Sequence, residues 1–198
     1  MAAGSKGTTG ISAKQARSTE PPRYFYQLSA RAQRTYLKSD AIERFDLIPS
    51  PKALSLIDDL MRALDFGAPS SVERAAQLLL DELCRLTGVR AIQLAVRGVR
   101  PHNAKGELHG IFYPHAPRNT ASTARGADPL IVLWMRTAQR HDVVKPKTFF
   151  RTLMHELGHY LDYALLQLDD SFHTAGFFKR ESFLVRVLYR SAPPDRNP

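Results

Sequence analysis

Cysteine is almost absent from this chain of 198 residues, in which Cys84 is the only one. A single thiol allows neither an internal disulfide framework nor a zinc ribbon built from cysteines. Long apolar runs are absent too, since no segment approaches the roughly 18 apolar residues of a membrane-spanning helix. The first residues also lack the apolar core of a secretory signal. We therefore expect no membrane partner and a cytoplasmic location.

Acidic residues are in the minority, with 19 of them against 28 Lys and Arg, and the formal net charge is +9. A basic surface attracts nucleic acid through contacts that weaken as the salt concentration rises. Lys179, Arg180, Arg186 and Arg190 would give one helix a basic side that either follows phosphates or is simply solvated. Nucleic acid is therefore a candidate partner that charge alone does not establish.

The spacing of apolar residues predicts helices toward both ends of the chain and strands between them. We expect helices over residues 29–44, 51–66, 70–88, 146–168 and 176–189, and strands over 89–99, 107–113 and 130–136. Ser29 and Ser50 are placed to cap the first two helices, and Ser70 with Glu73 has the spacing of a capping box. The order of these elements predicts an α+β fold with a small sheet.

The segment His155-Glu156-Leu157-Gly158-His159 fits the pattern HExxH. Residues four apart lie on the same side of a helix, so both imidazoles can reach one metal ion. Glu156 projects beside them, within reach of a water molecule at that ion. Zinc suits such a site because it lowers the pKa of bound water to about 7 and polarises a carbonyl group. The same pattern also arises by chance, from two histidines that only pack on a buried helix.

A catalytic zinc takes a third protein ligand, and the residues after the motif offer several. His173 follows a turn just before the next predicted helix, so the chain can fold back and bring it to the ion. Glu181 lies in the middle of the last helix, where thermolysin-like enzymes have their third ligand. Asp169 and Asp170 lie where the motif helix should end, and Asp162 better suits a hydrogen bond to a ligand. One zinc per chain is expected, and these alternatives remain open.

A second motif follows HELGH after thirteen residues, in His173-Thr174-Ala175-Gly176-Phe177. Together the two motifs resemble the SprT-like metallopeptidases, in which HExxH is followed by His-Gly-x-x-Phe at the start of another helix. The resemblance covers roughly residues 85–190. It implies a zincin-like fold, zinc held by the three histidines, Glu156 as general base, and protein substrates that include proteins bound to DNA. Thr174 stands where the family usually has glycine, and the cysteine ribbon of several members is absent.

Composition and this resemblance divide the chain into four parts. Residues 1–22 and 191–198 are expected to be disordered tails, the first of them basic. Residues 23–88 form a helical extension, and residues 89–190 form the SprT-like metallopeptidase domain. The extension is not explained by the resemblance.

We expect a zinc-dependent metallopeptidase that hydrolyses a protein or peptide with metal-activated water. One alternative is a basic nucleic-acid-binding module whose HELGH site is structural or inert, and another is hydrolysis of an amide in a small molecule. Residues 130–136 fit either a sheet edge to which a peptide substrate adds as a strand, or an ordinary core strand. Tyr160 and Tyr163 either hydrogen-bond a developing oxyanion or pack in the core.

Overall fold

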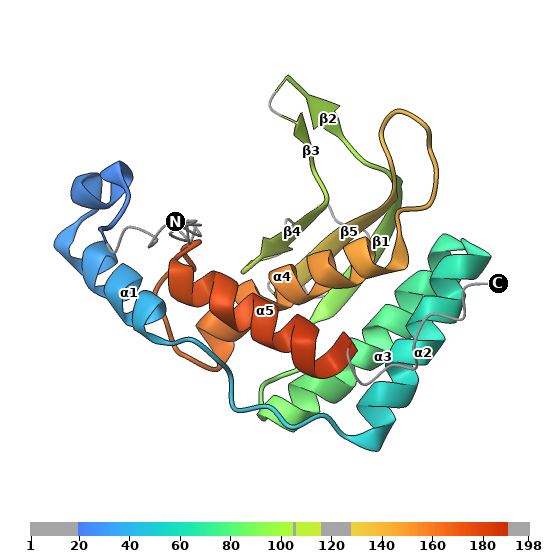
Figure 1. Ribbon diagram of the computed structural model, residues 1–198, viewed down its shortest axis with the longest axis horizontal. Coiled ribbons are helices and arrows are strands. Elements are labelled where there is room, and N and C mark those ends of the chain that lie inside the picture. Colours follow the sequence, from blue (N-terminus) through green and yellow to red (C-terminus); the bar gives the residue numbers. More distant parts are fainter. Residues whose placement is uncertain (1–19, 105, 116–127, 190–198) are drawn as a thin grey trace, which may run out of the picture.

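The computed structural model describes residues 20–104, 106–115 and 128–189. Within these ranges, the fold consists of five α-helices, a three-stranded sheet that packs against α3 and α4, and a two-stranded hairpin that extends beyond the sheet (Figure 1). The two predicted tails lie almost wholly outside the described residues. None of the described helices is both long enough and apolar enough to cross a membrane.

The N-terminal part consists of η1 (Arg23–Gln27), α1 (Ala30–Ala41) and α2 (Pro51–Phe66). Ser29 and Ser50 each accept a hydrogen bond from the amide three residues later, at 3.2 Å and 3.0 Å, which confirms both predicted N-caps. The Ser50 hydroxyl also donates to Glu82 at 2.7 Å and so connects the start of α2 to α3. Gly67 ends α2 in the left-handed conformation, with φ of 76°.

Helix α3 spans Pro69–Thr87 and begins without the predicted capping box. Its N-cap residue is Ala68, which makes no side-chain hydrogen bond to the helix, so the prediction for Ser70 and Glu73 is wrong. Pro69 occupies the first turn, where a missing N–H costs nothing. The Glu73 carboxylate instead accepts a hydrogen bond from the amide of Val96 at 2.7 Å, which connects α3 to the sheet.

The sheet has the order β1-β5-β4, formed by β1 (Gln93–Val99), β5 (Leu130–Arg136) and β4 (Gly110–Tyr113). Strand β1 runs parallel to β5, and β4 runs antiparallel to it. The interpretation of residues 130–136 as a sheet edge is therefore wrong, because β5 is central and five of its seven residues are buried. The predicted strand 107–113 is divided between β4 and the hairpin of β2 (His102–Asn103) with β3 (Gly106–Glu107).

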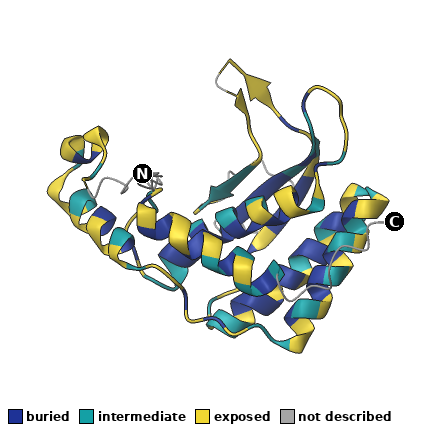
Figure 2. Ribbon diagram, in the orientation of Figure 1, coloured by how far each residue is buried: buried dark blue, intermediate teal, exposed yellow. Residues whose placement is uncertain are grey.

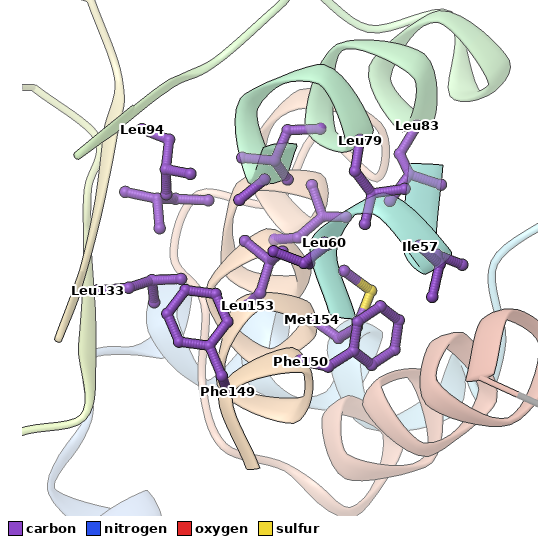
Figure 3. Packing of buried hydrophobic residues seen from close by; sticks show 14 of the residues in the cluster. Ile57, Leu60, Leu79, Leu83, Leu94, Leu133, Phe149, Phe150, Leu153 and Met154 are labelled. Atoms are coloured by element: carbon purple, nitrogen blue, oxygen red, sulfur yellow. The ribbon is translucent and has the colours of Figure 1, made fainter. Parts of the chain in front are cut away.

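Helices α4 (Pro146–Ala164) and α5 (Ala175–Tyr189) complete the fold. Figure 3 shows one core formed by Ile57 and Leu60 of α2, Leu79 and Leu83 of α3, Leu94 of β1, Leu133 of β5, and Phe149, Phe150, Leu153 and Met154 of α4. Each such side chain contributes roughly 1.5–3 kcal/mol by its burial. The α+β class is confirmed, and helices of the predicted extension share this core with the motif helix.

Candidate metal centre

Three histidines converge at the C-terminal half of α4. His155 and His159 extend from α4, one turn apart, and His173 extends from the segment that leads into α5. Their Nε2 atoms form a triangle with sides of 3.3 Å, 3.0 Å and 3.1 Å. Tetrahedral zinc with Zn–N bonds of about 2.0–2.1 Å separates its ligands by about 3.3–3.4 Å. The three residues are therefore close enough to hold one metal ion.

The opposite ring nitrogens of the two helical histidines are hydrogen-bonded. Nδ1 of His155 donates to the Glu181 carboxylate at 2.9 Å, and Nδ1 of His159 donates to the Ser171 hydroxyl at 2.7 Å. Ser171 in turn donates to Asp162 at 2.8 Å. With Nδ1 protonated, Nε2 keeps its lone pair, and the ring orientation is fixed as at many metal sites. The donor set thus fits a metal ion.

This arrangement assigns different places to the acidic candidates for the third ligand. Glu181 lies on the far side of His155 from the triangle and also accepts a hydrogen bond from Arg151 at 2.7 Å. Asp162 reaches His159 only through the Ser171 hydroxyl. Asp169 pairs with Arg31, at the surface. The structure brings His173, and none of these carboxylates, to the Nε2 atoms of the other two histidines.

The pKa values of these groups favour neutral imidazoles beside a carboxylate. Burial, together with the neighbouring His155 and His173, lowers the pKa of His159 to about 3. Burial and His155 also lower the pKa of His173. Burial alone would raise the pKa of Glu181, but hydrogen bonds from His155 and Arg151 outweigh it and the pKa is lowered. Neutral imidazoles are the form that binds a metal ion.

Arg180 of α5 forms buried hydrogen bonds that stabilise the helices around the His173 segment. Its side chain is fully buried, and it donates to both oxygens of Asp162, at 2.8 Å and 3.0 Å. It also donates to the backbone carbonyls of Ser39 and Ile42 at the end of α1. The interpretation of Arg180 as part of an exposed basic side of the last helix is therefore wrong. Arg190, which is predicted on the same side, lies outside the described residues.

Helix α1 contacts the same segment directly. The Asp40 carboxylate accepts a hydrogen bond from the Gly176 amide at 3.0 Å, and a Cβ at Gly176 would clash with the Asp40 carbonyl oxygen. Only glycine permits this approach. Thr174 bonds Ser39 at 3.3 Å and accepts from the Phe177 amide at 3.0 Å, so this threonine caps the start of α5.

Glu156 lies next to the histidines with its carboxyl against the edge strand. It is buried, and this burial raises its pKa to about 7, although His155 opposes the rise. A Cβ at Gly110 would lie 2.8 Å from Oε1 of Glu156, so the strand can approach this carboxyl only without a side chain. Two depressions, of about 460 Å³ and 350 Å³, share Gly110, His155 and Glu156. A cleft therefore passes over Glu156 along β4.

Sequence reasoning missed two residues of this site. Ser171 is a loop hydroxyl whose only signal is its nearness to His173 in the chain, whereas a glycine inside a predicted strand could have indicated the close approach at Gly110. Of the two tyrosines, Tyr160 donates to the carbonyl of Arg90 at 2.6 Å and packs in the core. Tyr163 lines the smaller depression and donates to Asp170.

Loss of Arg180 should weaken the whole fold because it leaves the Asp162 carboxylate buried without its partner. We expect Arg180→Leu to lower the free energy of unfolding by about 3–5 kcal/mol, measured by urea denaturation. The exposed pair of Arg31 and Asp169 provides the control, and Arg31→Leu should have a far smaller effect. Asp162→Leu together with Arg180→Leu should restore part of the loss; equal effects of the two single arginine changes would contradict the assignment.

Removal of His173 should abolish stoichiometric metal binding because only two imidazoles would remain. Mass spectrometry of the purified protein should find about one metal ion per chain in the wild type and in His102→Ala, a change in the exposed hairpin. Glu181→Gln should keep the ion but bind it about 10–100-fold more weakly. A folded His173→Ala variant with undiminished metal content would overturn this ligand set.

Comparisons with protein-family models, with curated proteins and with solved structures found no match to this chain. The resemblance to SprT-like metallopeptidases therefore stays a prediction based on the two motifs. What the structure itself establishes is a cluster of three histidines, able to hold one metal ion, within an α+β fold.

Proposed function

We propose that this chain is a zinc-dependent peptidase with a zincin-like fold and one zinc per chain. The observation that supports it most is the triangle of Nε2 atoms with the Glu156 carboxyl beside it, because all four side chains line the cleft. A purely structural metal site is normally closed by four protein ligands, whereas a catalytic site offers three and keeps a position free. Three imidazoles at the floor of a cleft fit the second kind.

Zinc held by the three imidazoles would supply the Lewis acid that lowers the pKa of water and polarises the carbonyl of the substrate. Glu156 would accept the proton of the attacking water and later give it to the leaving amine. A carboxyl with a pKa of about 7 is suited to both transfers near neutral pH. Glu181 and Ser171 would hold the rings of His155 and His159 in position throughout.

A peptide would bind along the outer edge of β4. In the described part of the chain, β4 pairs with β5 on one side only, so its other edge can accept a further strand. The cleft lies along this edge, and at Gly110 the backbone of β4 approaches the Glu156 carboxyl closely. A peptide added there as a strand would pass directly over the three histidines. An extended edge of this kind favours peptide hydrolysis over hydrolysis of a small molecule in a closed pocket.

Replacement of the general base should stop catalysis and leave the metal in place. For Glu156→Gln we expect about 10²–10⁴-fold slower cleavage of casein, with zinc still at about one per chain. Asp59→Asn, the same carboxyl-to-amide change on the outside of α2, is the control. Undiminished cleavage by Glu156→Gln would exclude this residue as the base. Absence of cleavage in the zinc-loaded wild type, combined with salt-sensitive oligonucleotide binding, would favour the nucleic-acid-binding alternative.

A methyl group at position 110 should impair catalysis without loss of metal. In Gly110→Ala the new Cβ would meet Oε1 of Glu156 and the side chains of Leu133 and Thr152, each at 2.8 Å, so the carboxyl must move. We expect kcat to fall at least about tenfold, a loss of about 1.4 kcal/mol in transition-state stabilisation. Gly98→Ala in β1 is the matched control, since no atom lies within 4 Å of its added Cβ. Equal kcat values for the two variants would contradict the proposed contact.

A further inference from the structure

A hollow of about 750 Å³ adjoins the cleft, and four of the nine residues that line it are basic. Arg44 follows α1, Arg151 belongs to α4, and Lys179 and Arg186 belong to α5. Arg151 and Phe178 line both this hollow and the depression of about 460 Å³ beside Glu156, so the two spaces are contiguous. Figure 2 shows exposed residues along the outer face of α5, which forms one wall.

The positive charge of this hollow is only partly neutralised. Among the described residues that line the hollow, Glu43 is the one carboxylate, and it pairs with Lys179. Among the described residues, no carboxylate lies within 4.0 Å of Arg44 or Arg186. Arg151 uses its Nε for Glu181, while its two terminal nitrogens have no partner in the described part of the chain. Three guanidinium groups can therefore still receive an anionic ligand.

Resting on the proposed peptidase function, we propose that this hollow binds acidic side chains of the substrate on the C-terminal side of the scissile bond. Antiparallel strands pair slightly more stably than parallel ones, so a peptide added to β4 would run antiparallel to it. Its residues after the scissile bond would then lie beside Gly110, His109 and Glu107, toward the start of β4. From this end the cleft opens past Arg151 into the basic hollow.

An acidic peptide fits these walls better than a nucleic acid does. Glu43 lies within the hollow, and Glu107 and Glu181 line the adjoining end of the cleft. A nucleic acid carries a charge at every phosphate and would be repelled by these carboxylates, whereas a peptide can place charged residues at the arginines and neutral ones elsewhere. One face of the Phe178 ring stacks on His173, with centroids 5.6 Å apart. Only the other face of this ring is available to stack with a nucleobase.

The test uses two fluorogenic peptides that are identical up to the scissile bond and carry either Glu or Gln at the positions after it. The wild type should show a higher kcat/KM for the acidic peptide by about five- to tenfold, as expected for two or three exposed charge pairs. In Arg44→Gln combined with Arg186→Gln this ratio should fall to about two. Arg74→Gln combined with Arg97→Gln removes the same charge from exposed positions on α3 and β1, and should keep the wild-type ratio.

Equilibrium binding of the labelled acidic peptide to metal-loaded Glu156→Gln protein, measured by fluorescence anisotropy, separates this proposal from the catalytic one. In Arg44→Gln combined with Arg186→Gln, the affinity for the acidic peptide should fall by the same factor as the ratio of kcat/KM values. In Arg74→Gln combined with Arg97→Gln, the affinity should stay unchanged. If no peptide is cleaved but this pattern of binding is found, the peptidase proposal fails and the acidic-ligand site stands. The proposal of an acidic-ligand site would be overturned by equal cleavage of both peptides, or by a preference for acidic residues before the scissile bond. It would also be overturned if a single-stranded oligonucleotide displaced the labelled peptide at a lower concentration than the unlabelled acidic peptide does.

Discussion

The buried ion pair between Arg180 and Asp162 determines how the third histidine meets the other two. The two side chains are only 1% and 0% exposed, and removing each charge from water costs several kcal/mol. That cost is offset because Arg180 also donates to the carbonyls of Ser39 and Ile42, and Asp162 also accepts from Ser171. Helices α1, α4 and α5 therefore meet at one pair of charges. The segment between α4 and α5, which carries His173, is held by hydrogen bonds to α1 and α4 and leads directly into α5.

The candidate metal centre is consequently built from parts that are distant in the chain. Ser39 in α1 and Thr174 beside His173 are 135 positions apart, yet their hydroxyls are 3.3 Å from each other. Helices α2 and α3 share their core with the motif helix, so the residues before position 89 support the site from two sides. Because the imidazoles are held by the same contacts that hold the helices together, metal affinity and folding stability should change together. The helices that precede the sheet are a structural part of the centre.

Much of the site could be predicted because helical spacing alone places His155 and His159 on one face. The third histidine could not be derived in this way, since it extends from a segment without periodicity, and Glu181 remained an alternative third ligand by its place in the chain. What separates them is which ring nitrogen each one faces: His173 meets the Nε2 side of His155 and Glu181 its Nδ1 side. The helices and the central strand follow from apolar patterning, whereas β4 is only four residues long and has no such pattern.

The short length of β4 and its lack of an apolar pattern have a physical cause in the site. Strand β5 is buried on both faces, which is typical of a central strand, whereas the side chains of β4 are all half-buried and its first residue is glycine. Any larger residue at position 110 would stabilise the strand but would occupy the space of Oε1 of Glu156. The carboxyl that would move the proton therefore requires a short edge with a glycine. In the described part of the chain no strand pairs with the outer side of this edge, where a substrate would add as a further strand.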